Sequence, residues 1–162
     1  MKRIQKHNQQ LTRRGAALVE FAVIAPLFMI LILGTIEIGA ALRGSAILFQ
    51  GVRGGARLAA MDYHDMIPDG TTGNQKVEDD IRNFMKAAGI PGDEANIQIT
   101  HASGTNSRSF FDLDDPDNQH LLFRVEATLP YTAVSDFPNR YFGSMDLRAS
   151  VVMRAGRSTL SQ

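Results

Sequence analysis

Arg13-Arg14-Gly15-Ala16-Ala17-Leu18-Val19-Glu20-Phe21 joins a basic segment, which ends at a glycine, to an apolar run that continues to Ile36. Glu20 is the one acid near the start of this run. A carboxylate buried alone in an apolar environment costs several kcal/mol, so Glu20 needs a partner there. The stretch therefore predicts a helix that enters an apolar environment and carries a paired acid near its start.

Charge is distributed unevenly along the 162 residues. The segment before the apolar run holds no acid and five basic residues, namely Lys2, Arg3, Lys6, Arg13 and Arg14. Removing these five from the 17 basic residues leaves 12, against 17 acidic residues, so the rest of the chain is mildly acidic. Such a body does not favour nucleic acid binding. The absence of cysteine excludes disulfides, thiolate chemistry and cysteine metal sites.

The apolar run is long enough to cross a bilayer, which takes about 20 residues. From Phe21 to Leu42 it is interrupted by one acid, Glu37. The basic flank predicts a cytoplasmic N-terminus and a body on the opposite side. Three interpretations fit this segment: a secretory signal cleaved near Gly39-Ala40-Ala41, an uncleaved signal anchor, or a precursor cut after Gly15. The third gives both Gly15 and Glu20 a role.

Gly15 and the residues that follow it, through Glu20 and Phe21, resemble the prepilin-peptidase site of type IV pilin precursors. Three segments in order resemble TadE-like proteins, the pilin-like minor components of the tight-adherence pilus system: Glu20 to Leu27, Gly34 to Gly39, and Val52 to Ala60. The resemblance covers about residues 13 to 60. It implies cleavage between Gly15 and Ala16 by a prepilin peptidase, and partners among other pilin-like subunits and the pilus assembly platform.

Glu20 also has a physical role that does not depend on the family. After cleavage Ala16 carries an ammonium group near the membrane boundary, and Glu20 lies about one helical turn further on. Its partner is its own amine or, as the resemblance implies, the amine of a neighbouring subunit. The alternative is a Glu20 that reaches headgroup water at the interface. Phe21 is interpreted as a side chain that faces lipid or a subunit.

The remaining pattern predicts an α+β fold, in which a long N-terminal transmembrane helix continues into a stalk and carries a small antiparallel β-sheet and one short helix. We divide the chain into a cytoplasmic leader (1–15), a transmembrane and stalk helix (16–60) and an extracytoplasmic head (61–162). The small residues Gly51, Gly54 and Gly55 suit a helix pressed against a partner.

The short helix is predicted from apolar residues at helical spacing, with Asn74 as its cap and with Gly89 and Pro91 closing it. These apolar residues are Val77, Ile81, Phe84, Met85 and Ala88. Three strands are predicted from period-two alternation. Their inward residues are Ile97 and Ile99; Leu121, Phe123, Val125, Ala127 and Leu129; and Leu147, Ala149, Val151 and Met153.

The head shows no motif for catalysis or for a cofactor. Asp112, Asp114, Asp115 and Asp117 lie in one loop, but an EF-hand counted from Asp112 would need glycine and glutamate where Asp117 and Phe123 stand. We therefore interpret residues 112–118 as a solvated acidic loop and the chain as non-catalytic, with no cofactor and no metal.

The function expected is that of a pilus assembly component, a minor pilin or pseudopilin processed by a prepilin peptidase and assembled through its N-terminal helix. The expected location is the bacterial inner membrane, crossed once, with the body in the periplasm. The alternative is an uncleaved membrane-anchored extracytoplasmic binding module. The sequence leaves open whether the protein enters the filament, sits at its tip or stays in the platform.

Overall fold

The computed structural model describes the backbone of residues 3–61, 70–135 and 145–156, and the side chains from residue 15 onward within these ranges. The chain forms two compact units, residues 1–39 and residues 40–162. Its elements, in order, are α1 (Arg3–Ala60), α2 (Gly73–Ala87), η2 (Gly92–Glu94), β1 (Asn96–His101), η3 (Pro116–Asn118), β2 (Leu122–Pro130), η4 (Tyr131–Ala133) and β3 (Asp146–Arg154).

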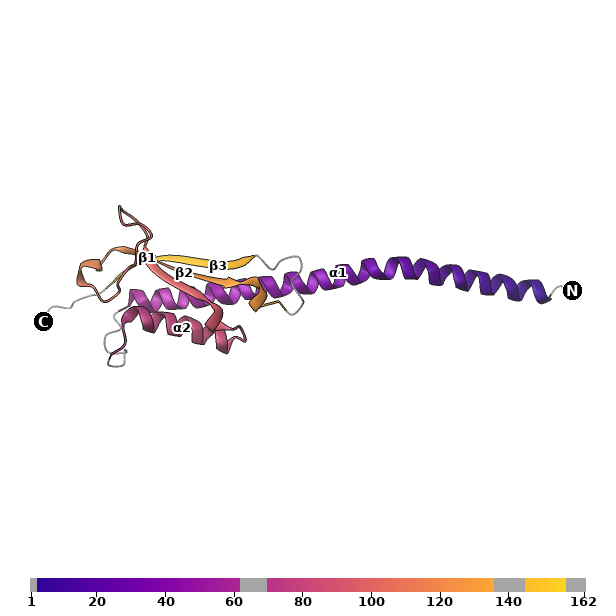
Figure 1. Cartoon of the computed structure of the whole chain (residues 1–162), viewed down its shortest axis with the longest axis horizontal. Helices are drawn as coiled ribbons and strands as arrows, with labels where there is room; N and C mark the ends of the chain where they lie inside the picture. The colour runs from indigo at the N-terminus through magenta and orange to yellow at the C-terminus, as the bar shows by residue number, and fades with distance from the viewer. Residues whose placement is uncertain (1–2, 62–69, 136–144, 157–162) are drawn as a thin grey trace. The chain divides into compact units, whose positions relative to one another are not determined.

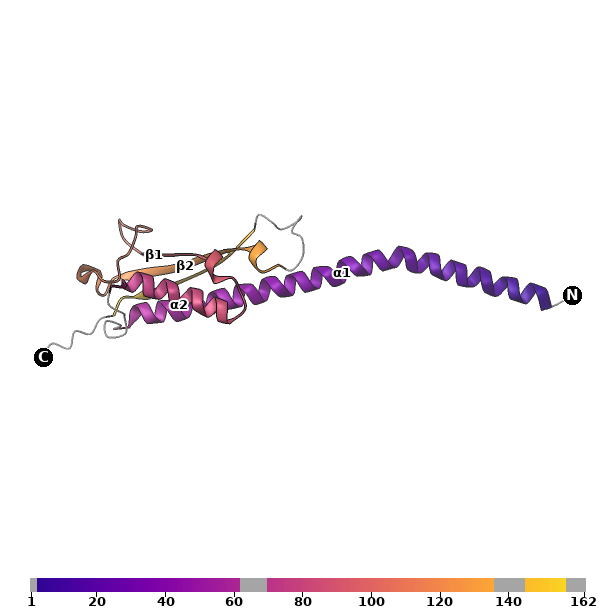
Figure 2. The ribbon, with the colours of Figure 1, turned by 60° about the horizontal axis from the view of Figure 1, so that its bottom comes forward.

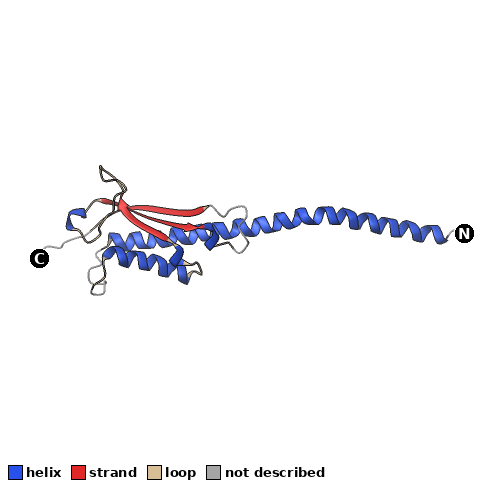
Figure 3. Cartoon of the chain, viewed as in Figure 1, coloured by secondary structure: helices blue, strands red, loops and turns tan. Residues whose placement is uncertain are grey.

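The predicted α+β fold is confirmed. In the unit formed by residues 40–162, a three-stranded antiparallel sheet in the order β1-β2-β3 lies on one side of two helical segments, α2 and the C-terminal half of α1 (Figures 1 and 2). Colouring by secondary structure shows the same two layers (Figure 3). From here on we call this whole unit, residues 40–162, the head; it includes the second half of α1 in addition to residues 61–162.

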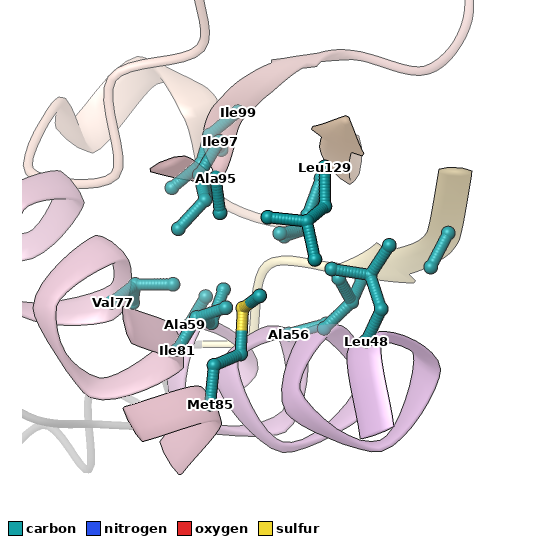
Figure 4. Packing of buried hydrophobic residues seen from close by; sticks show 14 of the residues in the cluster. Leu48, Ala56, Ala59, Val77, Ile81, Met85, Ala95, Ile97, Ile99 and Leu129 are labelled. Atoms are coloured by element: carbon teal, nitrogen blue, oxygen red, sulfur yellow. The ribbon is translucent and has the colours of Figure 1, made fainter. Parts of the chain in front are cut away.

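The core of the head lies between these two layers. Leu48 and Ala56 of α1 face Leu129 of the sheet, while Ile81 and Met85 of α2 lie below the β1 side of the sheet (Figure 4). The inward row of β2 is fully buried, as the alternation predicted: Phe123, Val125, Ala127 and Leu129 are each 0% exposed. Burial of the Phe, Val and Leu side chains in this row stabilises the head by roughly 1.5–3 kcal/mol each.

Helix α1 ends at Ala60, as predicted. It begins at Arg3, upstream of the predicted start at Ala16, so neither Gly15 nor Pro26 interrupts its helical backbone. Glycine lowers helix propensity by about 1 kcal/mol, and proline removes one hydrogen bond, but neither loss is large enough to end a helix of this length.

The short helix α2 begins one turn earlier than its first apolar residue, and its cap differs from the prediction. Thr72 is the N-cap: its side chain accepts a hydrogen bond from the Gln75 N–H at 3.2 Å, and the Thr72 N–H donates one of 3.2 Å to the Gln75 side-chain Oε1. The prediction of Asn74 as the cap was wrong, because Asn74 is inside the helix and buried. Gly89, with φ of +83°, follows the C-cap Ala88, as predicted for the helix end.

The three predicted strands are confirmed with one correction at a boundary. Leu121 was assigned to the inward row of the second strand, but β2 begins at Leu122 and Leu121 is 45% exposed. The preceding residue, His120, has φ of +65°, so the chain turns there before the pleat begins. The β2–β3 register aligns Leu122 with Arg154 and Pro130 with Asp146.

Candidate assembly and processing site

The N-terminal unit presents an apolar helix surface that no other part of the described chain covers. Within α1, residues Gly15–Ala60 contain a stretch apolar and long enough to cross a membrane, and none of that stretch is buried. Phe21, for example, is 69% exposed and Leu31 is 57% exposed. Side chains this apolar and this exposed require either lipid or another protein around them.

The predicted site residues lie together at the start of this surface. Gly15, Ala16, Glu20 and Phe21 are all exposed on α1, within about two helical turns. Among the described residues, nothing outside the adjacent helix backbone lies within 4 Å of the Cβ position of Gly15. The Glu20 side chain makes no hydrogen bond or ion pair with any residue that the structure describes. The structure therefore places these four residues on one helix and brings no second element to them.

The second half of α1 has the opposite environment. Leu48, Val52 and Ala56 are 0% exposed and form part of the head core. Two of its glycines permit close contact with α2: a Cβ at Gly51 would lie 3.2 Å from Phe84, and one at Gly55 would lie 2.5 Å from Ile81. The partner expected for these small residues is therefore α2 of the same chain, although Gly54 has nothing within 4 Å.

The acidic loop, residues 112–118, and the residues just before it are hydrogen-bonded to the start of α2, which the sequence did not predict. The Asp114 carboxylate accepts a hydrogen bond of 2.7 Å from the Gly73 N–H at the first residue of α2, where a negative charge suits the helix dipole. Asn74 donates to the Phe111 carbonyl at 2.8 Å and accepts from the Leu113 N–H at 2.9 Å. The sequence held one indication of these contacts. Asn74 places an amide side chain at a position that the helical spacing predicts to be buried, where such a side chain needs hydrogen-bond partners.

The side chains of two other aspartates in the loop accept hydrogen bonds from backbone N–H groups two residues further along the chain. The Asp112 carboxylate accepts from the Asp114 N–H at 3.0 Å, and Asp115 accepts from the Asp117 N–H at 2.9 Å. Within the described ranges, no group of three His, Cys, Asp or Glu side chains is placed to hold a metal ion. The loop therefore has a structural explanation in its contacts with α2 and with its own backbone.

A single exposed apolar helix that leads into an α+β head is the arrangement of a membrane-anchored protein. The family model for TadE-like proteins matches residues 15–57, which begins at the predicted processing glycine and ends within the last turn of α1. No curated protein and no solved structure matches the chain. Residues 15–57 are thus TadE-like, as the motifs predicted, and the match indicates a pilus-associated component of a structural rather than a catalytic family.

Proposed function

We propose that this chain is a minor pilin or pseudopilin that a prepilin peptidase cuts between Gly15 and Ala16 and that then assembles through the N-terminal part of α1. The precursor is inserted in the bacterial inner membrane with its basic leader in the cytoplasm and its head in the periplasm. Its partners are the peptidase, other pilin-like subunits and the pilus assembly platform.

The observation that carries the proposal is the coincidence of the TadE-like match with an exposed apolar helix. The matched segment starts at Gly15, and the side chains from Leu18 to Ile36 have no protein environment in the described chain. Helices with such a surface are stable in a bilayer and can exchange lipid for the helices of neighbouring subunits. Glu20 and the amine created at Ala16 then supply one charged pair within that apolar layer.

Cleavage is tested by the mass of the mature protein. We expect protein from the native host to begin at Ala16, and protein from a host strain that lacks the prepilin peptidase to keep residues 1–15. Gly15→Leu should block cleavage, because a bulky side chain replaces the small residue next to the scissile bond.

Gly34→Leu is the matched control, since Gly34 lies on the same helix and its Cβ position is equally open. It should be cut normally. Gly15→Leu protein that still begins at Ala16, or wild-type protein with an intact N-terminus, would contradict the proposal and favour the uncleaved binding module.

A further inference from the structure

The strand register places a row of side chains on the outer face of the head sheet. Residues 108–111 close the β1 edge of the sheet, and Phe110 pairs there with Thr100. Thr100 pairs in turn with Arg124 of β2, which pairs with Val152 of β3. Paired residues point to the same face of a sheet. This row alternates with the buried residues of β1 and β2, so it points away from the core.

The next pair along the strands, Leu122 and Arg154, extends this row into a patch. Its apolar side chains are exposed to solvent: Phe110 is 68% exposed, Val152 45% and Leu122 37%. Its two cations, Arg124 and Arg154, form no ion pair with a described residue. We call these five residues the sheet patch. Exposed apolar groups around two unpaired cations suit a partner that offers both apolar and acidic groups.

The described chain leads away from the sheet patch at both ends of β3. After β3, a Cβ at Gly156 would lie 3.2 Å from the carbonyl of Ala60, so the chain continues on the side of the helices. Before β3, Met145 accepts a hydrogen bond from the Tyr131 N–H at the opposite end of the strands. From there to Val152 is about 23 Å at ~3.3 Å per residue.

The acidic loop has the chemistry that the sheet patch lacks. Asp112 and Asp117 are exposed, and neither forms an ion pair with a described residue. Pro116, just before Asp117, adds exposed apolar surface. The loop is also held in one shape, because the Asn118 side chain donates to the Asp112 carbonyl at 2.9 Å. A loop that is already ordered loses little conformational entropy when it binds.

The loop of one molecule cannot serve the patch of the same molecule. The hydrogen bonds from Gly73 to Asp114 and between Asn74 and Leu113 attach the loop to the start of α2. Helix α2 lies on the core side of the sheet, whereas the patch is on the other side (Figures 1 and 2). A contact between loop and patch therefore joins two molecules.

Charge selects this contact over the symmetric alternatives. Two patches face to face would bring four arginines together, and two loops would bring together carboxylates, and both arrangements are repulsive. A patch against a loop pairs opposite charges. Each copy then uses its patch toward one neighbour and its loop toward another, so the contact is heterologous and can repeat without closing.

We propose that the sheet patch binds the acidic loop of a second copy of this chain. The inference rests on the proposed function, with a second copy among the subunits that assemble side by side. The carboxylates of Asp112 and Asp117 face Arg124 and Arg154, and Pro116 packs on the exposed apolar side chains of the patch. The contact links heads, in addition to any contact that the N-terminal part of α1 makes.

The test uses cysteine cross-linking of full-length protein in its native membrane, since the chain contains no cysteine of its own. Ser150→Cys lies beside the patch on the outer face of β3, and Pro116→Cys lies in the loop. With a short bis-maleimide, the protein that carries both should form a ladder of dimers, trimers and larger species. Each single variant should not. Asn83→Cys, exposed on α2, replaces Pro116→Cys in the control pair and should give no ladder.

Charge reversal in the two-cysteine protein separates specific pairing from simple proximity. Arg154→Glu should reduce the ladder roughly three- to tenfold, and Asp117→Arg should do the same. The two changes combined should restore most of the yield, because opposite charges meet again. Protease resistance of the head confirms that each variant is folded.

Three results would overturn the proposal: dimers formed by a single cysteine at the yield of the pair, an adduct with a different protein, or a folded double reversal that does not regain the ladder. The same samples report the mature N-terminus by mass. A missing ladder in protein that begins at Ala16 would overturn this contact alone. A ladder in protein that keeps residues 1–15 would support the contact and contradict processing, and a missing ladder in such protein would contradict both.

Discussion

The two halves of α1 have similar apolar content but opposite surroundings. Leu31 in the first half is 57% exposed, whereas Leu48 in the second half is 0% exposed. From Phe21 to Ile36 the helix carries no charge and its large apolar side chains are exposed, as expected for a helix in lipid or among other helices, whereas the second half of α1 buries one face against the sheet and α2. One continuous helix therefore presents exposed apolar side chains at one end, where we propose assembly, and forms part of a folded core at the other.

The largest expected effect comes from removing the second half of α1. We expect residues 61–162 alone not to fold, because the core loses Leu48, Val52 and Ala56, while residues 40–162 should fold and unfold cooperatively. Thermal unfolding followed by circular dichroism distinguishes the two fragments. A cooperative transition in the shorter fragment would show that the buried half of α1 is dispensable.

Truncating one leucine in each half gives a matched pair. Leu48→Ala should lower the free energy of unfolding of the head by about 2–5 kcal/mol, because it leaves a cavity in the core. Leu31→Ala should change it by less than about 0.5 kcal/mol, since Leu31 touches no part of the head core. Urea unfolding of the full chain in detergent, followed by near-ultraviolet circular dichroism of the buried Tyr131, measures both. Equal losses would contradict the division of α1.

Glycines in the two halves provide a finer comparison. A methyl group at Gly55 would lie 2.5 Å from Ile81, so Gly55→Ala should destabilise the head by about 1–3 kcal/mol through overpacking. Gly34 has nothing within 4 Å, and Gly34→Ala should leave head stability unchanged. The same unfolding measurement applies. A neutral Gly55→Ala would mean that Ile81 moves aside at no cost.

The elements of the fold were predictable because each one has a local pattern. The apolar run and the spacing of Val52 and Ala59 led to a helix ending at Ala60, and alternation around Val125 led to a buried strand. The match over residues 15–57 likewise confirms a resemblance carried by short motifs. Properties set by neighbours within about four residues are therefore accessible from the sequence of this chain.

Contacts between residues that are far apart in the sequence were not predictable. Asn74 looked like a helix cap, but its partners are Phe111 and Leu113, 37 and 39 positions away. The closure of the β1 edge by residues 108–111 depends on a positive φ of 72° at Arg108, which no pattern indicates. The roles of Gly15 and Glu20 remain predictions, because their expected partners are a peptidase and other subunits rather than parts of this chain.

Of these variants, Glu20→Gln should change the free energy of unfolding of the head least. It therefore tests the role of the exposed half of α1 separately from the stability of the head. Glu20 contacts no described residue of the head, so the free energy of unfolding of the head should not change. The amide keeps the shape of the side chain but cannot neutralise the Ala16 ammonium within an apolar layer, where an unpaired charge is costly. Incorporation with other pilus components should therefore fall several-fold, as measured by co-purification.

Glu94→Gln is the control for this variant, because Glu94 is an exposed acid on the head. The Glu94→Gln protein should assemble normally. The mature N-terminus must be checked in both proteins, because a loss of cleavage would also prevent assembly. Reduced assembly of correctly cut Glu20→Gln protein would show that the carboxylate is needed after processing. Normal cleavage together with normal assembly would instead place Glu20 in headgroup water, and the charged pair would then have no part in holding subunits together.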